Sequence, residues 1–72
     1  MHNEEIFIKN VGKRIVELRT SKNLKQIELA YLLDIEDSAL RRIEKGKTNP
    51  TLKTLLRISK ALKVDITELF EF

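Results

Sequence analysis

Residues 26–46 read QIELAYLLDIEDSALRRIEKG, and no other part of the chain is as informative. Apolar residues recur at helical spacing in both halves of this stretch, which predicts one short helix over 26–33 and another over 37–45. Residues 34–36 are left for the turn between them, and Gly46 ends the second helix because glycine adopts the left-handed conformation without strain. The stretch therefore predicts two short helices joined by a tight turn.

Two residues of this helical pair indicate a close crossing. Ala30 is a small residue that lets the second helix pass close to the first, and Ile35 is an apolar plug within the turn. Such a pair is typical of a helix-turn-helix, whose second helix can lie in the major groove of DNA. Compact helical bundles that bind no nucleic acid contain the same features, so both interpretations stay open at this point.

The sequence before this pair predicts an amphipathic first helix. Apolar residues recur at spacings of three, four and three residues between Ile8 and Leu18. The helix begins between Asn3 and Asn10, either of which can cap it, and ends near Asn23, a residue type that tolerates the left-handed turn.

The sequence after the pair predicts two more helices. Pro50 marks a turn because it holds the preceding residue in an extended conformation. A helix over 52–62 follows, and Asp65 with Glu68 resembles a capping box that opens a last helix over 66–70. On the helix over 52–62, one face is expected to carry five residues together: Leu52, Leu55, Leu56, Ser59 and Leu62. The whole chain, residues 1–72, is therefore predicted to be one all-α domain with five helices.

The composition excludes several functional classes. A chain of 72 residues makes one small domain, and with no cysteine and only His2 it can form neither a disulfide nor a multi-histidine zinc site. A Ser-His-Asp catalytic group would depend on that single histidine near the chain start, so we expect no enzyme activity, no metal site and no cofactor. No apolar run approaches about 18 residues and no secretory signal opens the chain, which indicates a cytoplasmic protein without a membrane span.

The charge is small in sum but uneven along the chain. The net charge is +3, yet residues 41–63 hold eight lysines and arginines against Glu44 alone, while residues 64–72 hold three acidic residues and no basic one. This asymmetry predicts one surface that faces a polyanion and one end of the molecule that faces elsewhere. The alternative interpretation is a set of solvated helix faces.

Six short motifs follow one another along the chain: VGKRI at 11–15, LR at 18–19, QIELA at 26–30, IEKG at 43–46, NP at 49–50 and LKVDITEL at 62–69. In this order and spacing, over about residues 11–70, they resemble the Cro/repressor-type (XRE) helix-turn-helix family. The resemblance implies a five-helix, lambda-repressor-like domain of transcriptional regulators, with its helix-turn-helix at 26–45. It also implies binding of double-stranded DNA, usually as a homodimer on a palindromic operator.

The resemblance assigns base contacts to the exposed positions of the recognition helix. These positions are Asp37, Ser38, Arg41 and Arg42. Arg42 is the leading candidate because bidentate contact of arginine with guanine is the commonest specific contact, whereas Arg41 can contact a base or a phosphate. Two carboxylates at the helix start depart from the family pattern. Glu36 is interpreted as stabilising the helix N-terminus, and the role of Asp37 is left open because a carboxylate faces DNA favourably only when it accepts from a cytosine amino group.

The resemblance also assigns phosphate contacts and one internal ion pair. The phosphate contacts are expected from Lys25, Gln26, Lys45, Lys47 and Asn49. Gln26 should in addition brace the recognition helix, and Arg19 with Glu44 should pair inside the fold. Lys25 stands where the family favours a capping threonine or serine, and Asp34 where it often has glycine, so both positions depart from the pattern.

The C-terminal end is the expected dimer interface, because one recognition helix contacts too few base pairs for useful selectivity. The residues assigned to it are Ile66, Leu69, Phe70 and Phe72. The apolar cluster at 6–8 could extend this surface. In the alternative arrangement, Leu69 and Phe70 fold back onto the first helix as core and leave Phe72 at a frayed end.

The predicted function is that of a sequence-specific, dimeric DNA-binding transcriptional regulator, of repressor or controller type. Phage repressors, restriction-modification controllers and antitoxins resemble the chain equally in size and layout. The alternative is a protein-interaction module of the same fold, such as an antitoxin whose partner is a toxin. The basic run over 41–63 argues against a pure interaction role.

Overall fold

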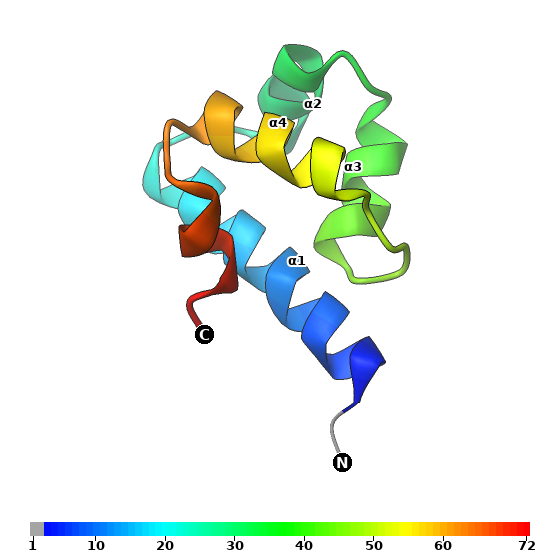
Figure 1. Ribbon diagram of the computed structural model, residues 1–72. Helices are drawn as coiled ribbons and strands as arrows, with labels where there is room; N and C mark the ends of the chain where they lie inside the picture. Colours follow the sequence, from blue (N-terminus) through cyan, green and yellow to red (C-terminus); the bar gives the residue numbers. More distant parts are fainter. Residues whose placement is uncertain (1–2) are drawn as a thin grey trace.

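Five helical segments build the computed structural model, which describes residues 3–72 (Figure 1). In chain order they are α1 (Glu4–Ser21), α2 (Gln26–Leu33), α3 (Asp37–Glu44), α4 (Leu52–Leu62) and the 3₁₀ helix η1 (Ile66–Phe70). In Figure 1, α1 runs diagonally beneath α4, and the C-terminal η1 packs against both helices. No strand occurs within residues 3–72, so the all-α prediction is confirmed. His2, which entered the argument against catalysis, lies outside the described residues.

An asparagine lies just outside each end of the first helix. Asn3 caps α1, because its Oδ1 accepts hydrogen bonds from the N–H groups of Glu5 at 2.9 Å and Ile6 at 3.3 Å. Asn23 has a left-handed φ of 59° just after the helix. Both boundaries agree with the prediction.

The turn between α2 and α3 is tight and buried on its inner side. Asp34 adopts the left-handed conformation with φ of 57°, and the N–H of Ile35 donates to the carbonyl of Ala30 at 3.1 Å. Ala30 and Leu33 are buried where the two helices meet. At the start of α2, the ammonium of Lys25 cannot accept a hydrogen bond, but the Glu28 carboxylate accepts from the Lys25 N–H at 2.7 Å, which keeps half of a capping box.

Two glycines allow α1 and the end of α3 to touch backbone to backbone. A Cβ atom on Gly12 would lie 2.6 Å from the carbonyl oxygen of Ile43 and 2.5 Å from that of Glu44. A Cβ atom on Gly46, whose φ is +71°, would lie 2.6 Å from the Cα of Lys9. Because backbone atoms cannot move aside without shifting a helix, the position of α3 depends on these glycines.

The buried face of α4 differs from the predicted one. Leu55, Ile58, Ser59 and Leu62 are buried, whereas Leu52 is 66% and Leu56 is 42% exposed. The predictions for Leu52 and Leu56 as inward-facing residues are therefore wrong, and Ile58 was missed. Two overlapping apolar stripes exist on this helix, and the docking of α4 onto α2 and η1 selects one of them.

The last predicted helix is present over residues 66–70 as a 3₁₀ helix, a type that suits a segment of only five residues. Asp65 caps it at Thr67, accepting from the backbone N–H at 3.0 Å and from the hydroxyl at 2.9 Å. These two bonds hold the pKa of Asp65 below its ordinary value. Arg14 ties η1 to α1, because its Nε donates to the carbonyl of Glu68 at 2.8 Å.

Candidate nucleic-acid interface

Helix α3 has a buried inner side and a polar outer side. Leu40 and Ile43 are buried where α3 packs against α1 and α2. Ser38, Arg41 and Arg42 are exposed to solvent, and the Asp37 side chain is half exposed. The structure thus places the four residues predicted to contact bases on one accessible helix, without testing those contacts.

The two arginines of the outer side differ in their surroundings. Arg41 Nη2 lies 3.5 Å from Asp37 Oδ2, one helical turn away, with both side chains 47% exposed. An exposed pair of this kind contributes only about 0.3–0.5 kcal/mol, so a stronger acceptor can replace it. Arg42 forms no ion pair within residues 3–72. Its guanidinium is therefore available to a ligand without breaking an internal contact.

The inner end of α3 is held by a buried ionic network centred on Glu44. Arg19 donates from Nε to Oε2 of Glu44 at 2.8 Å and from Nη2 to Oε1 at 3.3 Å. A further Arg19 nitrogen, Nη1, donates to the carbonyl of Leu24 at 2.9 Å. The side chains of Arg19 and Glu44 are only 11% and 4% exposed. The pair thus occupies the interior, and it joins α1 to α3.

Gln26 connects this network to the start of α2. Its Nε2 donates to Oε1 of Glu44 at 2.8 Å, so the first residue of α2 is joined to the last residue of α3. This bond is the bracing contact expected of Gln26. Lys25 comes directly before Gln26 in the chain, and Lys45 comes directly after Glu44. Lys47 and Asn49 lie in the loop that continues from Lys45, and all four side chains are exposed. Of the five residues predicted to contact phosphate, Gln26 forms the junction, Lys25 and Lys45 are next to it in the chain, and Lys47 and Asn49 lie farther along the loop.

The basic run of residues 41–63 does not form one surface. Lys60 and Lys63 lie at the end of α4 and line a groove with Lys22, which follows α1. About 12–15 Å of helix separates them from the loop around Asn49, at a rise of about 1.5 Å per residue. Arg57 donates to the carbonyl of Leu33 and so contributes to the packing of α4 on α2. The single polyanion-facing surface predicted from the charge count is therefore wrong for this half of the run.

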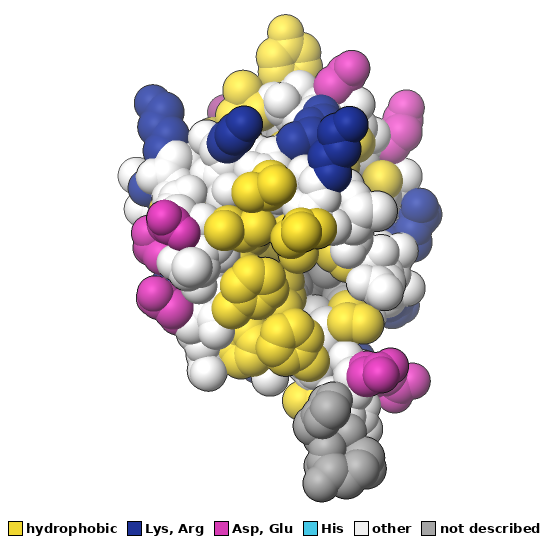
Figure 2. Space-filling view, in the orientation of Figure 1, with side chains coloured by type: hydrophobic (Ala, Val, Ile, Leu, Met, Phe, Trp, Pro, Cys, Tyr) yellow, Lys and Arg dark blue, Asp and Glu magenta, His cyan; other side chains and the backbone are white. Residues whose placement is uncertain are grey.

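A second exposed feature is an aromatic cluster formed by Phe7, Phe70 and Phe72. The ring of Phe7 stacks on that of Phe70 with centroids 6.1 Å apart and meets that of Phe72 edge-on at 5.5 Å. All three side chains are exposed, and Figure 2 shows apolar side chains gathered in a column over α1, η1 and α4. Ile6 in α1 and Leu56 in α4 are also exposed large hydrophobic residues.

The aromatic cluster corrects the prediction for the C-terminal end. Leu69 is fully buried and packs in the core, so its assignment to a dimer interface is wrong. Ile66 is partly buried against the same core. Phe70 remains at the surface because η1 turns every third side chain to the same side, and Ile66 and Leu69 take the inward side. Phe72 is exposed beyond the end of η1. Phe7 was not among the residues assigned to the interface, but it belongs to the apolar cluster at 6–8 that was expected to extend this surface.

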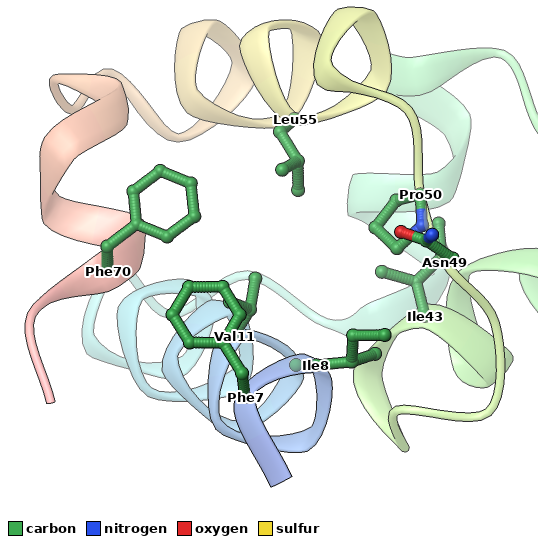
Figure 3. Close-up of a pocket in the computed structure, with 9 residues that line it drawn as sticks. Phe7, Ile8, Val11, Ile43, Asn49, Pro50, Leu55 and Phe70 are labelled. Atoms are coloured by element: carbon green, nitrogen blue, oxygen red, sulfur yellow. The ribbon is translucent and has the colours of Figure 1, made fainter. Parts of the chain in front are cut away.

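A small hollow of about 100 Å³ lies beside this cluster (Figure 3). Phe7 and Phe70 form one side of it, and Asn49 and Pro50 lie across from Phe70. Its lining contains no titratable side chain, so this hollow provides no acid, base or nucleophile. Within the described part of the chain, no group of three or more potential metal ligands occurs, and no helix has the length and apolar character needed to cross a bilayer.

Comparison with known proteins gives concordant results. The model of a family described as "Helix-turn-helix" matches residues 15–69. The control protein C.BamHI of Bacillus amyloliquefaciens is 36% identical over 62 residues, which cover 85% of this chain and 76% of that protein. The solved structure of the restriction-modification controller protein C.AhdI from Aeromonas hydrophila superposes with a TM-score of 0.84 at 36% identity, covering 88% of this chain and 96% of that one.

Other relatives are longer proteins. The HTH-type transcriptional activator BcrR of Enterococcus faecalis is 40% identical over 58 residues, which are 81% of this chain but 28% of that protein. The chain spans less than half the length of the first few curated relatives that it matches. Three observations lead to one conclusion. They are the family match over residues 15–69, the buried Arg19–Glu44 pair, and the two short helices joined by a tight turn. The chain belongs to the XRE-type helix-turn-helix family that its motifs resemble.

Proposed function

We propose that this protein is a sequence-specific DNA-binding transcriptional regulator that binds a palindromic operator as a homodimer in the cytoplasm. One observation carries the proposal. Arg42, which forms no ion pair within residues 3–72, and three further polar side chains lie on α3, while a buried ionic network holds that helix at its C-terminal end. A rigidly held helix with an unsatisfied cationic outer side is suited to read base edges in the major groove.

Arg42 is proposed to read a guanine, because it is exposed and forms no competing ion pair within the described part of the chain. Arg41 is proposed to contact a base or a phosphate after leaving Asp37, since their exposed pair is weak. Asp37 and Ser38 complete the accessible first turn of α3.

The junction of α2 with α3 is proposed to bind the phosphate backbone. The α2 N-terminus carries partial positive charge, and phosphate is the anion that such helix ends commonly bind. Gln26 uses one amide hydrogen on Glu44 and keeps a second for a phosphate oxygen. Lys25, Lys45 and Lys47 add charge, and Asn49 adds a neutral donor. Contacts of this kind position the protein without reading sequence.

The aromatic cluster is proposed to form the homodimer interface. A soluble monomer rarely leaves a contiguous aromatic and aliphatic surface exposed, and a two-fold dimer covers the same patch on both subunits. The cluster contains no residue of α3, so we expect both recognition helices to stay accessible in the dimer. Asn49, one of the proposed phosphate contacts, lies across the adjoining hollow from Phe70. Two half-sites would then lie about 34 Å apart along the duplex.

Selection of binding sites from random duplexes tests the proposal. We expect enriched sites with two inverted half-sites about 10 base pairs apart, centre to centre. If the dimer neutralises about six phosphates, the logarithm of the association constant should fall with the logarithm of salt concentration with a slope near −5. A slope of zero would remove the electrostatic basis of the proposal, and enrichment of single, asymmetric sites would contradict the dimer.

Sedimentation tests the interface directly. The wild type should be dimeric, and Phe70→Asp and Phe72→Asp should be monomeric with an unchanged circular dichroism spectrum, because both side chains are exposed. The same substitutions should abolish cooperativity between half-sites. Tyr31→Asp is a matched control, since Tyr31 is an exposed aromatic residue of α2 outside the cluster. A wild-type monomer at about 100 μM, well above the nanomolar range of specific DNA binding, would exclude the dimer.

A further inference from the structure

The outer side of α2 is apolar, although no part of the described chain covers it. Ile27, Tyr31 and Leu32 are 63%, 84% and 55% exposed. Together with Leu24 they line a shallow apolar strip along the helix. Contiguous apolar surface of this kind on a small soluble domain commonly marks an interaction site.

The strip continues into a groove with a charged rim. Leu24 and Leu32 belong to both features, and the groove extends over Ala61 and Leu62 at the end of α4. Lys22 from the end of α1 and Lys60 and Lys63 from the end of α4 surround it. We call this feature, with its four apolar and three lysine residues, the lysine-rimmed groove.

The electrostatics of the groove favour an anionic ligand. None of its three lysines forms an ion pair within residues 3–72. The C-terminal ends of α1 and α4 each contribute about half a negative charge, which leaves a local balance of about +2. Glu28 lines the adjoining strip, and its carboxylate already accepts a hydrogen bond from the backbone N–H of Lys25.

Neither DNA nor a second copy of the chain suits this groove. DNA would bring phosphates to the lysines but would leave the leucine floor without an apolar partner, and protein–DNA interfaces are polar. The acidic and apolar segment of the chain itself, residues 64–72, is already engaged, because Leu69 is buried and Arg14 holds the carbonyl of Glu68. The groove also shares no residue with the aromatic cluster.

We propose that the lysine-rimmed groove binds an acidic amphipathic segment of another protein. Leucine, isoleucine or phenylalanine side chains of that segment would pack on Leu24, Leu32 and Ala61. Its aspartates or glutamates would pair with Lys22, Lys60 and Lys63. Since the groove shares no residue with α3 or the 45–49 loop, the segment can bind while the protein is on DNA.

An NMR titration without DNA tests this inference independently of the DNA-binding proposal. The probe is a synthetic helical peptide of about 15 residues, with leucines at i, i+3, i+4 and i+7 and glutamates elsewhere. We expect amide shift changes confined to Leu24, Leu32, the 60–63 segment and their neighbours. Leu32→Asp, at an exposed position, and the double variant Lys60→Glu/Lys63→Glu should each weaken binding about tenfold or more. Lys53→Glu, on the same helix but outside the groove, should leave it unchanged.

Four outcomes would overturn the inference. One is the absence of shifts with the acidic peptide, and another is equal binding of a peptide with lysines in place of the glutamates. A third is dissociation of the wild-type oligomer by Leu32→Asp, which would make the groove an interface between copies. The fourth is the same pattern of shifts with a random duplex, abolished by Lys60→Glu/Lys63→Glu, which would make it a DNA contact.

Discussion

An arginine–carboxylate pair lies on each side of α3, but the two pairs differ in burial and therefore in their contribution to stability. On the inner side, Arg19 and Glu44 pair at 2.8 Å with almost no exposure, and every buried side-chain polar atom of the described residues has a hydrogen-bond partner. On the outer side, Arg41 and Asp37 pair at 3.5 Å and are half exposed. Solvent screens the outer pair and not the inner one, so the inner charges position the helix and the outer charges are free to bind.

This contrast predicts that inner substitutions change stability and outer substitutions change recognition. A set of variants on and around α3 can test the separation.

The largest effect is expected for Glu44→Ala. The substitution leaves the Arg19 guanidinium buried without its partner and also removes the acceptor of Gln26, so the free energy of unfolding should fall by about 3–5 kcal/mol. Urea denaturation measures the change. Glu36→Ala removes an exposed carboxylate from the start of the same helix and is the matched control, which should change stability by no more than about 1 kcal/mol. Equal effects of the two substitutions would show that burial does not separate the two sides of α3.

The next effect is expected for Gly12→Ala. The added methyl group would meet two backbone carbonyl oxygens of α3 at 2.5 and 2.6 Å, so α1 and α3 must separate at a cost of about 1–3 kcal/mol. Denaturation of this variant should be compared with that of Lys13→Ala, an exposed neighbour in α1. If Gly12→Ala were as stable as Lys13→Ala, the close contact of the helices would not be needed to position α3.

Arg42→Ala tests the outer side. It should cost about 1–3 kcal/mol of binding free energy on the selected operator and relax discrimination at one base position per half-site. Its stability should stay within about 0.5 kcal/mol of the wild type, because the side chain is exposed. Lys47→Ala should instead weaken binding to all sequences alike. Equal losses on specific and random DNA in both variants would contradict the assignment of Arg42 to base reading.

The smallest effect is expected for Asp65, a fully exposed charge far from α3 in the chain. The Thr67 backbone N–H and hydroxyl lower its pKa in the folded state, so the contribution of the carboxylate to stability is present above its ordinary pKa and is lost as the pH falls through the lower, folded value. Asp65→Asn cannot titrate. The stability difference between wild type and variant should therefore shrink when the pH is lowered from 5 to below its ordinary pKa of 3.8. A difference that is constant over this range would show that the capping bonds do not favour the ionised form.

Local signals in the sequence predicted most helix boundaries, because caps and turn residues act over a few neighbours. Asn3, Asn23 and Asp34 determine their turns through their own conformational preferences, and the structure agrees at all three. The internal Arg19–Glu44 pair was found through the family resemblance, since no local pattern joins two residues so far apart. Its geometry confirms the pairing.

The errors share a different cause. The inward side of α4, the position of Leu69 and the division of the basic run all depend on how one element docks against another. A helical stripe of leucines fits two rotations equally well until a neighbour covers one of them. A charge count along the chain likewise ignores the length of helix that separates Lys45 from Lys60.

The helices, their ends and the residue types available on α3 follow from the preferences of neighbouring residues, so they can be predicted from the sequence alone. The packing of distant segments sets which side chains remain exposed. It buried Leu69, exposed Leu52 and Leu56, brought Phe7 to Phe70 and Phe72, and gathered lysines of α1 and α4 around one groove. Burial is a property of contacts between distant segments, and the Gly12 contact shows how closely such segments must meet before a surface is defined.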